Sequence, residues 1–453
     1  MRVTKVDMLS GSITKGLLSM TMPIMIMNVM QSLFGIVDMT VLRLFADDRA
    51  VGAVGACGML ISLCTSLLIG VSAGANVVVA RRIGAGDKTR SEKAVITSLL
   101  CAVAGGFLLM GIGVIYAETF LKMTNCSESL LPQATEYFTI YFYGVPMMMV
   151  YNFCASILRA TGDTKRPMQL QIFCGTVKVL LDILFVSAFN MDVRGVAFAG
   201  VIANAIAGGL AFVILLKYQD AVRINFRKNQ VDLAELKDIL RIGIPTGVQS
   251  ALYSLANVVI TTAVNGFGEA ATTGIAIANQ FDGILYQISY APSLAVAPYV
   301  AQNFGAGNLK RVKKTLSCAV LITTAFGATF GMLSAVFSKQ LSSMMSSTPE
   351  VIAFSQQKMV IISSTYFICG IYEVMGGMLR GIGKPIPPTV ATLLYMCVLR
   401  FVWVYVVFPL YPNLTFLYLV WPIGWILSIA TLLIVYNRAM AKLQAQKISA
   451  SGV

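Results

Sequence analysis

Twelve long apolar segments run through this chain of 453 residues and restrict it to one class of fold. Each can cross roughly 30 Å of hydrocarbon as a helix, at a rise of about 1.5 Å per residue. None alternates apolar and polar residues as a membrane β-strand does. We therefore expect an all-α membrane protein with helices at about residues 15–42, 51–79, 94–117, 133–158, 167–189, 194–216, 240–265, 274–300, 315–337, 354–379, 386–409 and 414–436.

The charges of the chain indicate its orientation in the membrane. Only 12% of the residues are charged, against about 25% in soluble domains. Of the 34 lysines and arginines, two fall inside spans, 26 lie on the even side with the termini, and six lie in odd loops. Those six are Arg43, Arg49, Lys122, Arg194, Lys339 and Lys358. This split predicts cytoplasmic termini, a multi-pass protein of the inner (plasma) membrane and no nucleic-acid partner, despite a net charge of +14.

Two motifs recur at one offset and indicate an internal duplication. Residues 80–87 (ARRIGAGD) recur as 301–308 (AQNFGAGN), and residues 158–162 (LRATG) recur as 379–383 (LRGIG), each 221 positions later. Because the repeated unit holds six helices, an even number, both copies cross the membrane in the same direction. The sequence therefore predicts parallel repeats related by an axis along the membrane normal, a plan typical of secondary transporters.

The repeat also suggests a division into lobes. We expect an N-lobe at residues 1–216, a polar cytoplasmic linker at 217–241 and a C-lobe at 242–453. The Gly-Ala-Gly motifs lack the Lys-Ser/Thr ending of a phosphate loop and follow no strand. We interpret them as tight turns between helices, where glycine permits a positive φ.

These features together resemble one transporter family. The first helix, with its proline Pro23 and its Val-Asp ending at Asp38, the Gly-Ala-Gly turns and the Leu-Arg turns at 158–163 and 379–384 are similar to those of the MATE (multidrug and toxic compound extrusion) family. The resemblance implies two six-helix bundles forming a V-shaped cleft. It also implies export of amphiphilic, often cationic, compounds driven by inward flow of H⁺ or Na⁺.

The repeat helps to separate scaffold from site, because a polar residue present in one copy only is a better functional candidate. At the positions of the second copy that match Asp38 and Asp182, the sequence has apolar or aromatic residues. Charged side chains inside a span cost about 2.5–3.5 kcal/mol and are usually functional. The resemblance to the prokaryotic DinF-like branch implies that these two aspartates couple transport to a cation. That cation is either H⁺ bound to Asp38 or Na⁺ shared by Asp38 and Asp182.

Three further residues are candidates for the same pocket, and two positions depart from the branch. Gln31 lies two turns before Asp38 on one helix face, and Asn204 lies in the sixth predicted helix. Four residues before the first aspartate, where the branch commonly has an aromatic residue with a hydroxyl, this chain has Phe34. Four residues before the second, where the branch commonly has asparagine, it has Lys178. Lys178 lies four residues before Asp182, so an ion pair is expected. Such a pair disfavours Na⁺ and leaves room for proton exchange at Asp38 or for an anionic or zwitterionic substrate.

The C-lobe offers secondary candidates. Asp282 and Glu373 lie inside predicted spans, and Glu373 corresponds to Asn152 in the first copy. Arg400 corresponds to Lys178, so a basic residue here is in part a feature of the repeat. For Glu373, a structural pair with Arg380 two turns away is the alternative.

The mechanism that these residues predict is antiport by alternating access. Protonation of Asp38, or Na⁺ shared with Asp182, lets the first helix bend near Pro23 and release substrate. We expect no cofactor, a monomer in the lipid bilayer and no enzymatic activity, because the chain has no histidine and no nucleophile–base pair. A lipid-linked oligosaccharide flippase of the same superfamily is the alternative; a channel is not favoured, because the polar residues within the spans are sparse and asymmetric.

Overall fold

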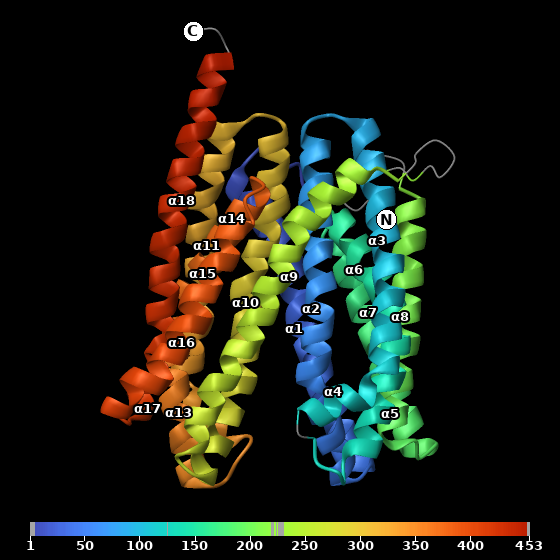
Figure 1. Ribbon diagram of the computed structural model, residues 1–453, viewed down its shortest axis with the longest axis vertical. Coiled ribbons are helices and arrows are strands. Elements are labelled where there is room, and N and C mark those ends of the chain that lie inside the picture. Colours follow the sequence, from blue (N-terminus) through green and yellow to red (C-terminus); the bar gives the residue numbers. More distant parts are fainter. Residues whose placement is uncertain (1–4, 125, 219–221, 223, 225–230, 451–453) are drawn as a thin grey trace. The chain divides into compact units, whose positions relative to one another are not determined.

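The computed structural model describes residues 5–124, 126–218, 222, 224 and 231–450, and that part of the chain contains helices and no strand (Figure 1). The predicted all-α class is therefore confirmed. In the first half the helices are α1 (Ile13–Phe45), α2 (Asp48–Gly84), α3 (Lys88–Ile115), α4 (Ala117–Met123), α5 (Leu131–Tyr143), α6 (Val145–Ala160), α7 (Lys165–Ile183) and α8 (Asp192–Leu216). A π-helical segment, Leu184–Ala188, continues α7.

The second half begins at α9 and ends near the C-terminus. Its helices are α9 (Leu233–Asn265), α10 (Glu269–Gly305), α11 (Leu309–Val336), α12 (Ser338–Ser343), α13 (Pro349–Ser364), α14 (Tyr366–Gly381), α15 (Ile386–Thr392), α16 (Leu399–Val402), α17 (Leu414–Tyr418) and α18 (Val420–Ala450). Two π-helical segments, Leu393–Val398 and Trp403–Val407, and a 3₁₀ turn, Phe408–Leu410, complete the stretch between α15 and α17.

The helices account for eleven of the twelve predicted spans as candidate membrane spans. Nine helical stretches of the described residues are long and apolar enough to cross a membrane, and two bent pairs bring the total to eleven. The predicted span at 274–300 lies within α10, which has 37 residues and is not among these candidates. The chain is thus a multi-pass α-helical membrane protein.

Two spans predicted as single helices, residues 133–158 and 354–379, are each broken. The pairs α5 with α6 and α13 with α14 are both bent by 47°. The first break falls at Gly144, just before Pro146, which cannot donate a backbone hydrogen bond. The second falls at Thr365, whose hydroxyl donates to the carbonyl of Ile362 at 2.9 Å and so competes with the helix ladder. Each of these predicted spans is thus a bent pair of helices and not one continuous helix.

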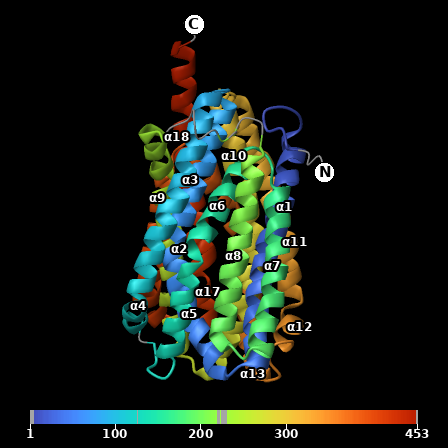
Figure 2. The ribbon, with the colours of Figure 1, turned by 90° about the vertical axis from the view of Figure 1, so that its right-hand side faces the viewer.

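The two halves repeat the same packing. In the first half α2, α3 and α6 pack on one another, and in the second α10, α11 and α14 do the same. Figure 2 shows α6 running between α3 and α8, and both of these helices pack against it. The short helices α4 and α12, which the sequence did not predict, begin 221 residues apart.

Close approaches of the backbone also recur at the repeat offset. A Cβ on Gly106 would lie 2.7 Å from the Cα of Pro146, and a Cβ on Gly327 would lie 2.6 Å from the Cα of Phe367. Both approaches join a long helix to the second half of a broken span. The break therefore places the same backbone segment against the same glycine in each half.

The Gly-Ala-Gly motifs form the predicted tight turns. Gly86 and Gly307 have φ of 72° and 70°, values that glycine adopts without steric cost. The next residue, Asp87 or Asn308, accepts a backbone hydrogen bond from the third helical residue at 3.0 Å or 3.1 Å and caps the following helix. These turns are thus structural.

The described chain groups into two compact units, and the units exchange segments. Unit 1 comprises residues up to Asp7 and Ile26–Ala251, and unit 2 comprises Met8–Met25 and Leu252–Val453. The helices α1 and α9 therefore each contribute to both units. The predicted linker at 217–241 is already helical from Leu233, and the lobe boundary drawn there stays a prediction.

Each exchanged segment is held at its start by an arginine at the same repeat position. In unit 1, Arg90 pairs with the fully buried Glu235 of α9 at 2.8 Å. In unit 2, Arg311 donates to the carbonyls of Met8, Ser10 and Gly11 ahead of α1, at 3.0–3.2 Å. The arginine at the start of the third helix of each repeat thus fixes the first helix of the other repeat.

In unit 1 the exchanged segment also packs through glycines. Gly70 and Gly74 of α2 face Gly243 and Gly247 of α9, so closely that a Cβ on Gly70 would collide with the backbone of Gly247. Both pairs have the small-xxx-small spacing that lets membrane helices approach closely. The first half of α9 is therefore an integral part of unit 1.

Candidate functional site

A cluster of three ionisable side chains lies inside the spans of unit 1. Lys178 Nζ is 2.6 Å from Asp38 Oδ1 and 2.9 Å from Asp182 Oδ2. Asp182 is fully buried, and the side chains of Lys178 and Asp38 are each 20% exposed. The predicted Lys178–Asp182 ion pair is present, and Lys178 joins Asp38 to it. We call these three residues the Asp–Lys–Asp cluster.

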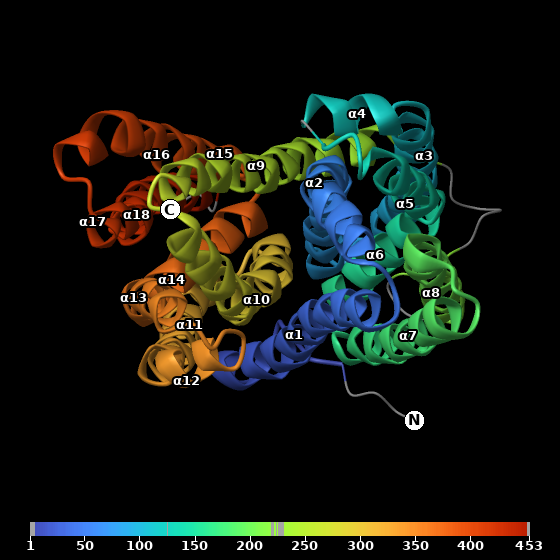
Figure 3. The same ribbon diagram turned by 90° about the horizontal axis from the view of Figure 1, so that it is seen from below.

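Local packing brings the cluster together. Phe34, one turn before Asp38 on α1, packs against Gly175, so closely that any larger residue there would strike its ring. Figure 3 shows this part of α1 along α7, with α8 beside α7. From α8, Gly200 leaves room for the stem of Lys178, whose Cε would be 3.7 Å from a Cβ at that position. Phe34 thus sets the approach of the two helices.

The charge of the cluster defines its chemistry. Two carboxylates and one ammonium carry a net charge of −1, so a single added proton makes the cluster neutral. The ammonium lies within 3 Å of both carboxylates, where a cation shared by them would sit. Among the described residues no group of three His, Cys, Asp or Glu side chains is placed to hold a metal ion. The position between the two carboxylates is thus occupied by the Lys178 ammonium.

The other predicted residues of the first half lie outside these contacts. Gln31 is exposed and Asn204 is partly buried, and no hydrogen bond joins either to the cluster within the described chain. Asn152 donates to the carbonyl of Met148 in its own helix at 2.9 Å. Pro23 lies inside the continuous helix α1, two residues before α1 passes from unit 2 to unit 1.

In unit 2 a second Lys–Asp pair appears, which the sequence did not predict. Lys358 Nζ is 2.8 Å from Asp282 Oδ2, and Lys358 also donates to Asn279 Oδ1. Lys358 is only 3% exposed and lies in α13, so counting it among the loop charges was wrong. The sequence offered one signal for this pair, because Lys358 is followed directly by an apolar stretch that begins at Met359.

The remaining C-terminal candidates are buried as well. Glu373 accepts a hydrogen bond from the Tyr286 hydroxyl at 3.2 Å. Arg400 is fully buried and donates to Asn257 Oδ1 at 2.7 Å. Its guanidinium lies over the Tyr253 ring at 5.4 Å and over Trp421 at 4.8 Å. Arg400 therefore rests on an amide and two aromatic faces.

The fold and these sites define a class of protein. Two parallel six-helix repeats with ionisable groups buried within the spans are the general plan of a secondary transporter. The sequence profile of the MatE family matches residues 23–184 and again residues 245–406, so the chain belongs to this family. The two matches begin and end 222 residues apart, which confirms the duplication and the MATE resemblance.

Relatives among known proteins span most of the chain. The probable multidrug resistance protein YpnP of Bacillus subtilis (strain 168) is 26% identical over 87% of this chain and 88% of its own length. The probable multidrug resistance protein NorM of Thermotoga maritima is 25% identical, with 84% and 83% covered. A protein of Shewanella oneidensis named FAD transporter is 23% identical, with 85% and 86% covered.

A solved structure agrees with the fold. A multidrug resistance MATE family transporter of the MOP superfamily, described as outward-facing, superposes with a TM-score of 0.91 at 18% identity. The superposition covers 98% of this chain and 99% of that one. At this identity the likeness shows the fold alone, which is the two-lobed MATE fold.

Proposed function

We propose that this protein exports small amphiphilic, often cationic, compounds in exchange for protons that bind the Asp–Lys–Asp cluster. The observation that carries the proposal is that Lys178 bridges Asp38 and Asp182 inside the spans. A buried net charge of −1 is costly in a low-dielectric environment. One proton removes that charge, and losing the proton restores it, so the cluster is a one-proton switch.

The same geometry argues for H⁺ rather than Na⁺ as the coupling ion. Na⁺ needs several oxygen ligands, and the two carboxylates offer theirs to an ammonium already in contact with both. For Na⁺ to bind between them, Lys178 would have to leave both partners. A proton requires no such displacement, since it binds a single carboxylate oxygen.

The proton switch acts through α1. Pro23 removes one backbone donor from this helix and so weakens its ladder two residues before α1 passes between the units. When Asp38 becomes neutral its attraction to Lys178 falls, and α1 is free to bend near Pro23. The bend reshapes the space beside the cluster and releases substrate outward.

The names of relatives support small molecules as substrates. Two are named multidrug resistance proteins, and one is named FAD transporter. A cluster of net charge −1 favours cationic compounds, which compete with the proton for the same charge. No organic cofactor is needed for such an exchange, and we propose that one chain in the bilayer is sufficient.

Placement in the bacterial plasma membrane with cytoplasmic termini is supported by the loop charges. With Lys358 buried inside α13, the other five of the six cationic residues first counted on the odd side remain, near helix ends or in the short helices α4 and α12. The excess on the even side is therefore larger than the sequence suggested.

The test is efflux of a cationic dye from proteoliposomes under separately imposed H⁺ and Na⁺ gradients. We expect the native protein to respond to the proton gradient alone and Asp38→Asn to lose that response. Asp47→Asn, at an exposed aspartate near the start of α2, is the matched control and should transport normally. Full proton-driven efflux by Asp38→Asn would refute the coupling role. Translocation of a lipid-linked sugar without dye efflux would favour a flippase.

A further inference from the structure

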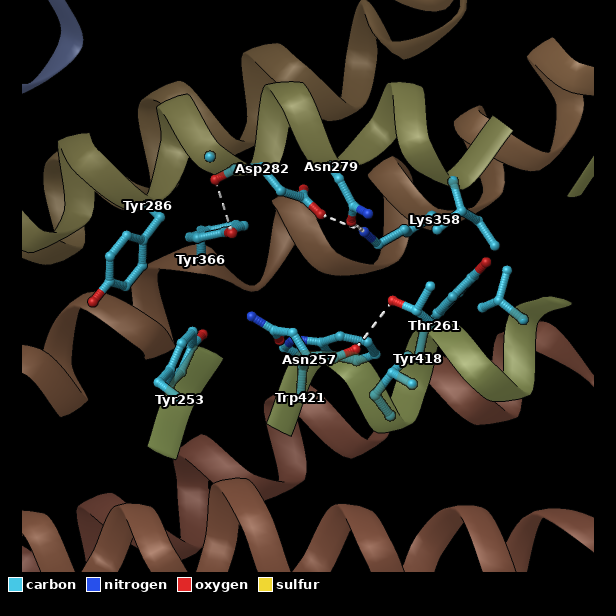
Figure 4. Close-up of a pocket in the computed structure, with 14 residues that line it drawn as sticks. Tyr253, Asn257, Thr261, Asn279, Asp282, Tyr286, Lys358, Tyr366, Tyr418 and Trp421 are labelled. Carbon is cyan, nitrogen blue, oxygen red and sulfur yellow. Dashed lines mark hydrogen bonds and ion pairs between the residues drawn. The ribbon is translucent and has the colours of Figure 1, made fainter. Parts of the chain in front are cut away.

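Unit 2 contains a pocket of about 340 Å³ that the coupling mechanism does not use. This volume lies within the range of roughly 300–1,000 Å³ that is usual for small-molecule sites. Figure 4 shows Tyr253 and Tyr286 at one end of the pocket and Lys358 at the other. Side chains of α9, α10, α13, α14, α17 and α18 line it.

Aromatic faces form much of the wall. Tyr253 and Tyr286 are stacked, with ring centroids 5.8 Å apart and an angle of 23° between the rings. Tyr366, Tyr418 and Trp421 line other parts of the pocket. Flat aromatic walls favour a flat aromatic ligand, because offset stacking adds about 0.5–1.5 kcal/mol per ring pair.

The charges around this pocket are unevenly distributed. Lys358 and Asp282 neutralise each other at 2.8 Å. Arg400 adds a positive charge behind Tyr253, Asn257 and Trp421, and no carboxylate is paired with it within the described chain. Behind the wall, Glu373 accepts a hydrogen bond from Tyr286, so the two cations and two carboxylates around the pocket balance overall. Next to Asn257, however, the nearest charge is the Arg400 guanidinium.

The two cations also fix the orientation of two asparagines that line the pocket. Ammonium and guanidinium groups only donate hydrogen bonds, so Arg400 must face Asn257 Oδ1 and Lys358 must face Asn279 Oδ1. The amide nitrogen of each asparagine is therefore turned away from the cation. In the described part of the chain neither nitrogen donates a hydrogen bond. Both are available as donors to a ligand.

Arg400 itself lacks partners for two of its donor atoms. Its side chain is fully buried, and Nε and Nη2 have no hydrogen-bond partner among the described residues. A buried guanidinium that lacks a counter-charge is strongly unfavourable. Because Asn257 lies between Arg400 and the pocket, an anion beside Asn257 would be separated from the guanidinium by one amide group and would supply the missing counter-charge.

We propose that this pocket binds a planar aromatic molecule carrying an anionic group, such as an aryl carboxylate. The ring stacks on Tyr253 and Tyr286, and the anion accepts hydrogen bonds from the amides of Asn257 and Asn279. Asp282 Oδ1, which has no donor in the described residues, accepts from a hydroxyl or N–H on the ring. The inference concerns binding alone and does not depend on the proton-coupling role of unit 1.

A charge series on the intact protein tests the proposal without any variant. Binding of 2-naphthoate, 2-naphthamide and 2-naphthylmethylammonium to the purified chain in nanodiscs is measured by calorimetry. We expect naphthoate to bind at least tenfold more tightly than the neutral amide, and the ammonium to bind most weakly. Equal or tighter binding of the ammonium overturns the proposal, as does the absence of naphthoate binding.

Variants then locate the site. Asn257→Asp keeps the size of the side chain but gives Arg400 a carboxylate and removes a donor. We expect it to weaken naphthoate binding at least tenfold and to reverse the preference toward the ammonium. Lys358→Gln should also weaken naphthoate binding at least tenfold. Lys339→Gln, at an exposed lysine of α12, is the matched control and should bind normally. Unchanged naphthoate binding by a folded Asn257→Asp protein places the ligand elsewhere and refutes this site.

Discussion

Replacing Lys178 by asparagine converts the Asp–Lys–Asp cluster into a pair of carboxylates. Because Nζ is 2.6 Å from one carboxylate oxygen and 2.9 Å from the other, these oxygens are at most about 5.5 Å apart. Two unit charges at that separation repel by about 3 kcal/mol at an effective dielectric constant of about 20. The net charge of the cluster changes from −1 to −2.

This change makes the variant sensitive to Na⁺. Removing one partner of a buried ion pair typically destabilises a protein by about 3–5 kcal/mol, because the other charge is left uncompensated. An added cation between Asp38 and Asp182 relieves that cost and accepts the asparagine carbonyl as a further ligand. We therefore expect Lys178→Asn to unfold at a lower temperature than the native protein in choline chloride. In NaCl it should recover much of the loss.

The assay is thermal unfolding in detergent, read by intrinsic fluorescence, in NaCl and choline chloride of equal ionic strength. Lys122→Asn is the matched control, because it breaks an exposed i, i+4 pair with Glu118 and should change stability by less than about 1 kcal/mol in either salt. The native protein should respond equally to both salts. If Na⁺ stabilises Lys178→Asn no more than the native protein, the ammonium does not occupy a cation position and the reasoning fails.

Two further predictions concern stability. Gly70→Ala should destabilise the fold by about 1–3 kcal/mol and so lower its thermal unfolding temperature, because the added Cβ collides with α9. Gly58→Ala, with open space in the same helix, should have no such effect, and equal effects of the two changes would contradict the glycine contact. The backbone N–H of Ala234 and the Lys93 ammonium lower the pKa of Asp232 below its ordinary value of 3.8. The carboxylate therefore stabilises the fold above pH 3.8 and ceases to do so as the pH falls through the lowered value. Asp232→Asn should be less stable at pH 7 and approach the native protein in acid; a deficit independent of pH would rule out this charge effect.

Much of the fold could be predicted because it rests on repeated local signals. Long apolar segments determine the helices, and the glycines Gly86 and Gly307 mark turns that need a positive φ. The pair of Lys178 with Asp182 followed from spacing along one helix. The contact of Lys178 with Asp38 joins α7 to α1, and helix spacing alone does not predict it.

Other features could not be predicted because they depend on tertiary contacts. The break at Thr365 has no proline or glycine at the junction, and only the position of its hydroxyl explains it. Lys358 sits near the start of an apolar segment, where a loop position and a buried one look alike in sequence. Its contact with Asp282 across two helices decides between them. The pocket of unit 2 likewise draws its walls from three pairs of consecutive helices, and the pairs lie far apart in the chain.

The exchange of first-helix segments between the units has an evolutionary consequence. Each compact unit contains part of the other repeat, fixed by Arg90 in one case and by Arg311 in the other. A single repeat on its own would lack the segment that completes its unit. An ancestor of half the length would therefore have needed a second copy to complete its unit, and gene fusion would have joined the two copies in one chain. Today the two halves, produced as separate fragments, can complete their units only in each other's presence.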